Sequence, residues 1–480
     1  MAATSPAYPS SPEDRARWEK TRLRLRLLSE EHDADLRRNM AAYLDPARLD
    51  AWGPPTIALN PFRSVISQLA VLYDQDPIVG NAEPLSPEQQ TWMAALQPFR
   101  IAALHMQNVL ACRESLYRIM WAPPTSASPA GIDIREVTGD CVVIYASPVA
   151  PSVPLRIEEC VSRPSLRTKK EAMVWDCWDI RDPARPTFSI EEDRDGERKD
   201  VTSTYVEAVP YPYIDPSTSL PYLPYVLYHA GAHGCLWDHW MWGALVAGSM
   251  DMSLLASFWI HIVKSASWQQ KYGMDAELQG LESRDVPNTH SGTGVGKGVS
   301  RQRVPTDPAS ILMFASKGDK QGTVNTLQAS ADPAAVITAI QDYARMIAES
   351  SGLAASDVEL SSGSSGVAIM IRRDGIRRLQ KQFEKHFRAG DEELLMKVSL
   401  IANLFGEGPA LPTSGWSVSY PGLPFSREED AERLAQWDAR IKMGLASRVD
   451  ALMALSGLTR DEASVELNRI ASENRVFTGA

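Results

Sequence analysis

A glycine-rich run is the first stretch whose residue types and spacing could do chemistry. Residues 292–298 read Gly-Thr-Gly-Val-Gly-Lys-Gly, and the backbone N–H groups of such a run can bind phosphate. A P-loop also needs Gly five residues before the Gly-Lys pair and Ser or Thr directly after it, where this chain has Ser291 and Gly298. The dinucleotide fingerprint fails as well, because Lys297 or Val299 stands where its third glycine belongs. We therefore expect a surface loop at Gly292–Gly298 that binds no nucleotide.

Three histidines and a cysteine near residue 235 have the side chains of metal ligands. The residues are His229, His233, Cys235 and His239. They straddle an expected junction between a strand and a helix, and spacing alone is weak evidence for a metal site. Packed or exposed side chains are the favoured interpretation, and no metal ligand is predicted.

Two further polar runs resemble reactive sites only in composition. Ser364-Ser365-Gly366 is not a nucleophile elbow, because the Gly-x-Ser-x-Gly pattern needs glycine where Val367 stands. The acidic run Glu191–Asp195 lacks the spacing of a calcium loop, and a hairpin tip explains it better. Since no catalytic residue and no cofactor-binding residue is predicted, we do not expect the chain to be an enzyme.

A basic run follows this serine- and glycine-rich segment. Residues 367–388 contain seven Arg or Lys residues against only Asp374 and Glu384. A helix of this composition could contact DNA phosphates or an acidic neighbouring subunit. The alternative is the solvated face of an amphipathic helix. The residues assigned to contacts with DNA or a subunit are Arg372, Arg373, Arg377, Arg378 and Lys381.

These residues belong to a predicted helical hairpin that spans Ala331–Phe405. Asp332-Pro333 is a helix start signal, and apolar residues then recur at three- and four-residue spacing as far as Ile347. The tip, Ser361–Gly366, contains only serine and glycine and can bend freely. A long helix is expected from Val367 to Phe405, with a break near Gly390.

The rest of the chain alternates between helical and strand-forming stretches, which predicts an α+β fold that is predominantly α. Helices are expected at 13–44 and 61–76, from the Ser86 capping box to about Trp121, at Cys235–Tyr272, and after the capping boxes at Ser426 and Thr459. Strands are expected at Cys141–Tyr145, Ala172–Ile180, Thr187–Glu191, Thr202–Ala208, Ile311–Phe314 and Trp416–Tyr420, with a hairpin turn at Asp195-Gly196.

Composition limits the function classes. The net charge of -11 argues against a general cationic nucleic-acid-binding protein, although it allows a channel through which DNA slides. Five scattered cysteines indicate a reducing compartment without a disulfide framework. The most apolar stretch, Leu236–Val263, is interrupted by Asp238, Asp251 and two histidines, so no contact with a membrane is expected.

The order of these parts resembles the portal proteins of tailed bacteriophages. Residues 60–81 resemble the family's early wing helix, and Leu220–Gly231 resembles the proline-rich strand before the stem. Ala331–Ala368 resembles the stem helix, the tunnel loop and the Ser-Gly-x-Ala entry to the long helix. Residues 417–434 and 449–474 resemble the strand after the tunnel and the crown helices. Gly273–Gln328 is the departure, because it matches no part of the family pattern.

The resemblance implies a portal-like fold with a helical wing, a β-rich wing insert, a helical stem, a small clip, a tunnel loop and a helical crown. The implied parts are a disordered N-terminus (1–12), the wing (13–234, helical at 13–122 and β-rich at 130–230), a wing-stem helix (235–272), the clip (273–330), a stem helix (331–355), the tunnel loop (356–366), the long tunnel and wing helix with its strand (367–425) and the crown (426–480).

The resemblance also implies a function. Portal subunits form a ring, usually of about twelve copies, at one capsid vertex. Double-stranded DNA passes through the ring during packaging and ejection, and the implied partners are the terminase large subunit, the major capsid protein, the scaffolding protein and a head-tail adaptor. The expected location is the virion, with host cytoplasm during assembly. The DNA-facing tunnel-loop residues would be Ser361, Ser362, Gly363, Ser364, Ser365 and Gly366.

Two alternatives remain from the residues alone. One is a soluble nucleotide-dependent enzyme that uses the Gly292–Gly298 loop, and the other is a helical structural adaptor without a channel.

Overall fold

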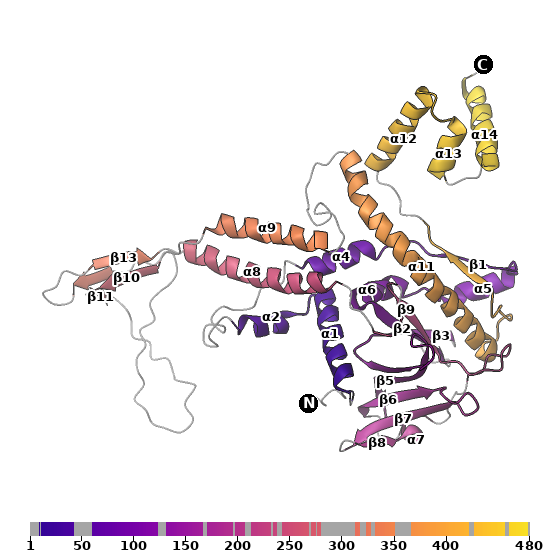
Figure 1. The fold of residues 1–480 in the computed structure, drawn as a ribbon, viewed down its shortest axis with the longest axis horizontal. Helices are drawn as coiled ribbons and strands as arrows, with labels where there is room; N and C mark the ends of the chain where they lie inside the picture. The colour runs from indigo at the N-terminus through magenta and orange to yellow at the C-terminus, as the bar shows by residue number, and fades with distance from the viewer. Residues whose placement is uncertain are drawn as a thin grey trace. The chain divides into compact units, whose positions relative to one another are not determined.

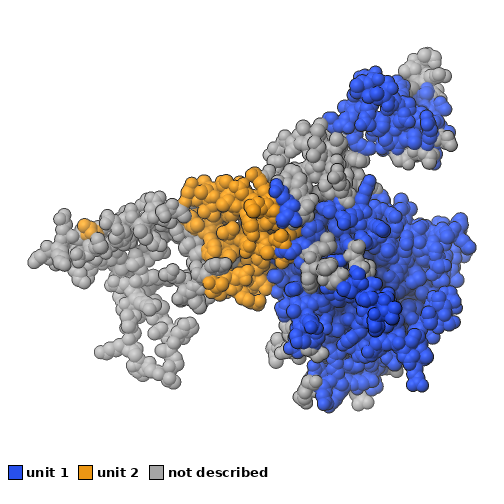
Figure 2. All heavy atoms as spheres, in the orientation of Figure 1, with its two compact units in different colours: residues 1–28, 63–243, 348–480 blue, residues 29–62, 244–347 orange. Residues whose placement is uncertain are grey.

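The structure is a computed structural model of the 480-residue chain (Figure 1). It describes residues 9, 11–42, 60–122, 131–166, 170–194, 197–206, 213–231, 234–237, 242–267, 270–274, 276–279, 313–316, 323–327, 332–350, 366–421, 427–456 and 460–478. The described residues form two compact units (Figure 2). Unit 1 comprises residues 1–28, 63–243 and 348–480, and unit 2 comprises residues 29–62 and 244–347.

Unit 1 contains two antiparallel sheets. The five-stranded sheet has the order β4 (Val142–Ala146), β5 (Pro154–Pro164), β6 (Glu171–Asp179), β7 (Thr187–Arg194) and β8 (Glu197–Asp200). The three-stranded sheet places β2 (Glu114–Ala122) between β3 (Gly131–Val137) and β9 (Tyr225–His229). Neighbouring strands in both sheets are antiparallel, and helices are also present, so the described part has a mixed α+β fold.

A hydrophobic core joins residues of both sheets. Because side chains alternate across a strand, β5 and β6 each present one apolar face, where Ile157 and Trp178 are completely buried. Burial of each such side chain stabilises the fold by roughly 1.5–3 kcal/mol. The other buried members of this core are Leu116, Val137, Val142, Tyr213, Leu223 and Tyr225.

Helix α1 (Pro12–Ser29) covers the opposite face of the five-stranded sheet. Trp18 stacks on Trp175 with 5.8 Å between ring centroids. The Arg17 guanidinium donates 2.6 Å hydrogen bonds to the carbonyl oxygens of Gly139 and Val142. The helix predicted at 13–44 is thus two helices, since Glu30 has a φ of 62° and α2 (Asp33–Met40) begins after it.

A second group of elements in unit 1 surrounds α11 (Gly366–Phe405). It comprises α4 (Pro61–Leu69), β1 (Ile78–Asn81), α5 (Pro87–Leu96), α6 (Ala102–Cys112) and β14 (Trp416–Ser419), and β1 pairs with β14. The Ser86 capping box is confirmed, because the Ser86 hydroxyl accepts from the Gln89 N–H and the Gln89 side chain accepts from the Ser86 N–H. The helices α12 (Arg427–Lys442), α13 (Arg448–Ser456) and α14 (Arg460–Thr478) end the chain.

Unit 2 is built on two antiparallel helices, α8 (Gly243–Ser267) and α9 (Pro333–Ser350). Gly248 near the start of α8 lies against Ile347 near the end of α9, and a Cβ at Gly248 would come within 2.2 Å of the Ile347 side chain. The Tyr343 hydroxyl donates to Asp251 at 2.9 Å. Two nested antiparallel pairs follow α8 and precede α9: β10 (Gln270–Met274) with β13 (Thr323–Leu327), and β11 (Ala276–Gln279) with β12 (Met313–Ser316).

The helix predicted from Ser86 to Trp121 is wrong beyond Leu96. The chain forms α5 and α6 and then enters β2, because Gln97 and Arg113 adopt φ values of 47° and 73° that end the helices. β2 is paired on both edges, by β3 and β9, so long-range pairing overrides the local helical pattern.

Three other boundaries differ from the predictions. Thr202–Tyr205 is the short helix α7 rather than part of a strand, because Asp200 accepts from the Thr202 N–H at 2.9 Å. The hairpin partner of β7 is therefore β8. The helix predicted from Cys235 begins at Gly243, after positive φ values at Trp237 and Trp242. At its other end it stops at Ser267, and Gln270–Met274 is β10.

Helices are confirmed on both sides of the predicted tip, as α9 and α11, but no break occurs at Gly390. α11 continues through Gly390 to Phe405. Because glycine has no Cβ, the helix can lie close to β9 at this position. A Cβ at Gly390 would lie 2.6 Å from the ring of Tyr228.

Candidate functional site

The predicted contact residues fall at the start of α11 and just before it. Ser361–Ser365 lie outside the described residues, and Gly366 is the first residue of α11. The Lys381 side chain is described and is exposed. Four further cations belong to α11, but their side chains lie outside the described part: Arg372, Arg373, Arg377 and Arg378.

Helical spacing places several of these cations together. Arg373, Arg377 and Lys381 recur every four residues and so share one side of α11. In the described part of this helix, Lys381 and Lys385 are exposed while Phe383 and Phe387 are buried. The predicted amphipathic pattern is confirmed there.

The C-terminal half of α11 packs on the protein. It lies against β2, β3, β9 and β14 (Figure 1). Its buried side chains follow the helical repeat of Phe387, Leu394, Val398 and Ile401, each with no exposed surface. The start of α11 therefore extends from a firmly packed base.

A buried carboxyl group lies in the middle of this packed half. Asp391 is 1% exposed and accepts hydrogen bonds from three tyrosine hydroxyl groups. Tyr73 donates to Oδ1 and Oδ2 at 3.0 and 2.9 Å, Tyr228 donates to Oδ1 at 2.7 Å, and Tyr420 donates to Oδ2 at 2.6 Å. Tyr73 follows α4, Tyr228 is in β9 and Tyr420 follows β14, so one side chain of α11 holds three separate segments. We call these four residues the Asp391 cluster.

The electrostatics of the Asp391 cluster are unusual because the tyrosines carry no charge. Burial raises the pKa of Asp391 to about 7, although the hydrogen bonds from Tyr420, Tyr228 and Tyr73 act in the opposite direction. Burial and the nearby Asp391 charge also raise the pKa values of Tyr73 and Tyr228 well above the ordinary tyrosine range. The phenols therefore stay protonated at physiological pH, while the carboxyl group can change its charge there.

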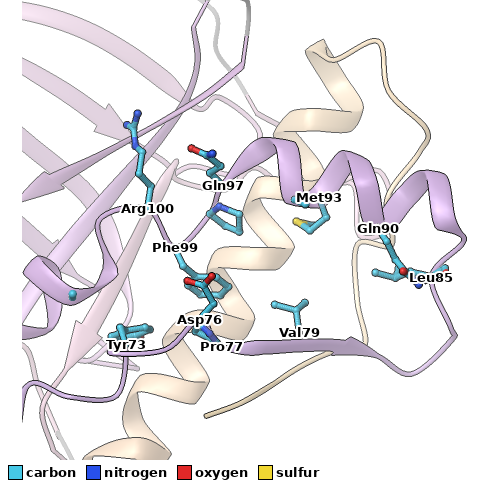
Figure 3. A pocket seen from close by; sticks show the side chains of 13 residues that line it. Tyr73, Asp76, Pro77, Val79, Leu85, Gln90, Met93, Gln97, Phe99 and Arg100 are labelled. Carbon is cyan, nitrogen blue, oxygen red and sulfur yellow. Dashed lines mark hydrogen bonds between the residues drawn. The ribbon is translucent and has the colours of Figure 1, made fainter. Parts of the chain in front are cut away.

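Tyr73 also borders a cavity of about 750 Å³ (Figure 3). Figure 3 shows Met93 of α5 and Val79 of β1 on two sides of it. The other lining residues are Asp76, Pro77, Leu85, Gln90, Ala94, Gln97, Pro98, Phe99, Arg100 and Ala103. The cavity thus adjoins the Asp391 cluster through the Tyr73 side chain.

A second buried polar cluster links the two sheets of unit 1. Arg118 of β2 contacts Glu159 of β5 at 3.0 Å and Asp176 of β6 at 3.3 Å. Arg163 of β5 donates to Asp176 from Nε at 2.8 Å, and Tyr225 of β9 donates to Glu159 at 2.6 Å. Burial alone would lower the pKa of Arg118. The two carboxylates and Tyr225 together raise the pKa by more than burial lowers it, so the guanidinium stays charged. We call this the Arg118 cluster.

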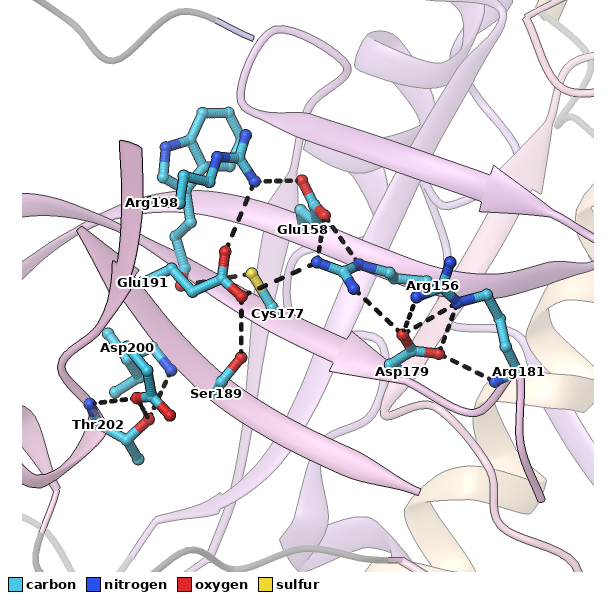
Figure 4. Close-up of polar contacts among 12 residues, drawn as sticks. Arg156, Glu158, Cys177, Asp179, Arg181, Ser189, Glu191, Arg198, Asp200 and Thr202 are labelled. Carbon is cyan, nitrogen blue, oxygen red and sulfur yellow. Dashed lines mark hydrogen bonds and ion pairs between the residues drawn. The ribbon is translucent and has the colours of Figure 1, made fainter. Parts of the chain in front are cut away.

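A third network lies on the face of the five-stranded sheet on which Trp18 of α1 packs (Figure 4). Arg156 contacts Glu158 at 2.6 Å and Asp179 at 3.2 Å. Arg198 covers the ring of Trp175 at 4.2 Å and contacts Glu158 at 2.5 Å. Charges of both signs alternate across the strands, as expected for a stabilised sheet surface rather than a catalytic site.

Of the three histidines near residue 235, the structure describes His229. His229 is buried in β9 and its Nδ1 lies 3.0 Å from Glu114, whose other oxygen accepts from the Trp237 N–H at 2.8 Å. Cys235 is exposed, and His233 and His239 lie outside the described residues. Among the residues that could be searched, no group of three or more His, Cys, Asp or Glu side chains is placed to hold a metal ion.

The acidic run beside β8 belongs to the strand pairing. Glu192 and Asp193 of β7 stand opposite Lys199 and Arg198 of β8. Asp195-Gly196, the predicted hairpin turn, and the glycine-rich loop 292–298 both lie outside the described residues.

In the searched part of the chain, one helical stretch, Gly243–Ile260, has the length and composition of a membrane span, and half of it is buried.

Comparisons with known proteins find similarities among solved structures alone. No family model matches the chain. No curated protein matches it either. The chain is similar to one in a solved structure described as the neck of an empty GTA particle computed with C6 symmetry, at 14% identity and a TM-score of 0.38. The similarity covers 83% of this chain and 89% of that chain, and it is too small to assign a fold or a function.

Sequence reasoning missed the Asp391 cluster, although one signal was present. Asp391 lies four residues after Phe387 and three before Leu394, so it occupies a position of the apolar stripe. A carboxylate at such a position requires hydrogen-bond partners, because an unpaired buried charge is costly. The partners are Tyr73, Tyr228 and Tyr420, which only the fold brings together.

Proposed function

We propose that the chain is a portal-type subunit that assembles into a ring at a capsid vertex. Double-stranded DNA would pass through this ring during packaging and ejection, and the ring would dock a terminase and a head-tail adaptor. The chain would act without catalysis and would reside in the virion after assembly in the host cytoplasm. The proposal rests on the sequence resemblance, on the antiparallel pair of α8 and α9 within unit 2, and on the long helix α11 within unit 1.

The observation that carries the proposal is the 40-residue helix α11. It begins directly after the serine- and glycine-rich segment, its first half carries the cations, and its second half is buried. A firmly packed base can hold the start of such a helix in a channel. Exposed cations such as Lys381 would then meet DNA phosphates or the next subunit.

Unit 2 provides the second support. α8 and α9 run antiparallel, and the β10–β13 pair returns the chain from a small module to the second helix. The chain thus runs through one helix, a small β module and a second helix that runs back. This order fits a stem that ends in a clip. A closed ring would bury further faces of such helices in heterologous contacts.

Imaging of the purified protein by negative stain, combined with light-scattering mass, tests the ring. We expect particles with an axial hole and a mass near twelve times the 52.9 kDa chain mass, to within about two subunits. A compact particle of one or two chains without a hole contradicts the proposal. Saturable nucleotide binding that is lost in Lys297→Ala would instead favour the enzyme alternative.

The role of the tip is tested in the same assembly. Replacing Gly363 and Gly366 with leucine should impair DNA packaging or retention while rings still form, because bulky side chains would obstruct a channel. Gly131→Leu is the matched control, since a Cβ at Gly131 meets no atom within 4 Å. Unchanged packaging and retention in the double variant would count against a tunnel role.

A further inference from the structure

The cavity beside Tyr73 has the lining of a docking site for a protein segment, and we call it the α5 cavity. Its volume of about 750 Å³ lies within the range of pockets that bind ligands. The rings of Tyr73 and Phe99 stack with 6.3 Å between their centroids, and Met93 of α5 forms a buried wall. Prolines and aliphatic side chains supply the rest of the apolar lining: Pro77, Val79, Leu85, Ala94, Pro98 and Ala103. Such a lining favours large apolar side chains as occupants.

The α5 cavity also contains a carboxyl group that has no partner in the described part of the chain. Asp76 lines the cavity, and no hydrogen bond or ion pair from a described residue reaches its side chain. Arg100 lines the cavity as well, but its side chain points away from Asp76 (Figure 3). A segment that carries a cation beside its apolar side chains would therefore complement the cavity.

The turn between α12 and α13 is an exposed segment of this kind, and its backbone is fixed at both ends. α12 ends in a Schellman motif, in which the Leu445 N–H donates to the carbonyl oxygen of Arg440 at 2.9 Å. Gly444 has the positive φ of 72° that this motif requires. α13 then begins with a cap, since the Ser447 hydroxyl accepts from the Asp450 N–H at 3.1 Å. We call residues 440–445 the α12–α13 turn.

The α12–α13 turn presents large apolar side chains and cations together. Met443 is 65% exposed and Leu445 is 75% exposed. In a Schellman motif, the residue at the position of Leu445 frequently packs against the end of its own helix, so this degree of exposure is unusual. The side chains of Arg440 and Lys442 are exposed beside them. Because the backbone of the turn is already fixed, docking orders little further chain.

We propose that the α12–α13 turn of one copy docks in the α5 cavity of the neighbouring copy. Met443 and Leu445 would enter the cavity, where a thioether beside the Phe99 ring is a favourable contact. Lys442 would lie beside Asp76, which supplies the opposite charge.

The present partner of Lys442 does not oppose this contact. Lys442 pairs with Asp438 at 2.6 Å, but the two side chains are 74% and 60% exposed. Ion pairs this exposed contribute little free energy. The ammonium group can therefore turn towards Asp76 of a neighbouring copy.

A second copy is the occupant because a closed ring needs two different surfaces on each chain. Cyclic assemblies of more than two copies use heterologous contacts, in which one patch meets a different patch of the next chain. The turn projects, the cavity is hollow, and their charges are opposite, so the two surfaces complement each other. This inference rests on the proposed ring and identifies one contact between its subunits.

Disulfide cross-linking of the full chain tests this contact. The variant combines Ala94→Cys in the cavity with Leu445→Cys in the turn, on a Cys235→Ser background that removes the exposed native thiol. A disulfide requires Cα atoms within about 7 Å of each other. Mild oxidation should therefore join chains into a covalent ladder. In the matched control, Val465→Cys replaces Leu445→Cys. Val465 is 69% exposed on α14, and this pair should give no ladder.

Exchange of charges tests the polar part of the contact. Asp76→Lys should raise the concentration needed for half-maximal ring assembly by about tenfold, because it places a cation opposite Lys442. Adding Lys442→Asp to the same chain should restore assembly. Both side chains are exposed, so the variants should fold, and circular dichroism checks this. A double variant that assembles no better than Asp76→Lys contradicts the pairing.

The outcomes separate this inference from the proposed function. Rings in negative stain that give no ladder overturn the contact and leave the ring intact. A ladder from particles without an axial hole supports the contact and overturns the proposed function, because a heterologous contact that does not close produces open chains. A chain that forms neither rings nor a ladder overturns both.

Discussion

Two buried carboxylates of unit 1 are stabilised in contrasting ways. Asp176 in the Arg118 cluster meets two guanidinium groups, whereas Asp391 meets three neutral phenols. Their residues are 0% and 1% exposed, so burial does not distinguish them. Arginine keeps its charge throughout the accessible pH range, so Asp176 has a permanent counter-charge and Asp391 has none. The comparison shows that two equally buried carboxylates can differ in whether a permanently charged group contacts them.

The two clusters also join different parts of the fold. The Arg118 cluster links the three-stranded sheet to the five-stranded sheet, and the Asp391 cluster links α11 to β9 and to the segments after α4 and β14. The joint between the sheets therefore contains a guanidinium group that stays charged. The joint between the helix and its support is held by a group whose charge can change.

The largest expected effect comes from removing the guanidinium of the Arg118 cluster. Arg118→Met leaves Glu159 and Asp176 buried with less positive charge, and the free energy of unfolding should fall by about 3–5 kcal/mol. Denaturant unfolding measures this loss. Arg135→Met is the control, because Arg135 is 64% exposed and pairs with Asp133 on the surface, so its effect should stay below about 1 kcal/mol. Equal effects of the two substitutions would show that the buried cation is not the essential partner.

The second expected effect is a pH dependence of stability that Asp391 contributes. Its pKa is raised from 3.8 in the unfolded chain to about 7 in the folded protein, so the folded state holds the proton more tightly. This stabilisation is complete below about pH 4 and is lost as the pH rises to about 7, by up to roughly 4 kcal/mol. Unfolding free energies over this range should show a shallower decline in Asp391→Asn. Identical pH profiles for the two proteins would contradict the assigned shift.

The smallest effect concerns how closely α11 approaches β9 beside Asp391. Gly390→Ala places a Cβ 2.6 Å from the Tyr228 ring, and the resulting overpacking should cost about 1–3 kcal/mol. Gly243→Ala at the start of α8 meets no atom within 4 Å and should be neutral or slightly stabilising. Thermal unfolding of the pair measures the difference. A Gly390→Ala protein as stable as its control would mean that the helix can shift without disturbing the cluster.

Local signals predicted much of the helical framework. The Ser86 capping box, the Asp332-Pro333 start and the apolar repeat of Phe383 and Phe387 each depend on residues within a few positions of one another, and the structure confirms these elements. β2 was missed because Glu114–Ala122 becomes a strand through its pairing with β3 and β9. Arg113, whose positive φ ends α6, is neither Gly nor Pro and gave no turn signal.

The Asp391 cluster and the Arg118 cluster could not be predicted from local sequence, because their members are far apart along the chain. Tyr73, Tyr228 and Asp391 are separated by more than 150 residues in sequence, and each alone reads as an ordinary aromatic or acidic residue. The acid at an apolar-stripe position indicated that partners were required but did not identify them. The contact between Arg118 and Asp176 depends in the same way on two sheets that meet only in the fold.

The nested strand pairs of unit 2 have an evolutionary consequence. β10 and β13 pair along five residues each, so the end of α8 and the start of α9 are held at a spacing set by one strand pair. Sequence inserted or deleted between β11 and β12 does not alter that spacing. We therefore expect this part of the gene to tolerate insertions and deletions that leave α8 and α9 in place.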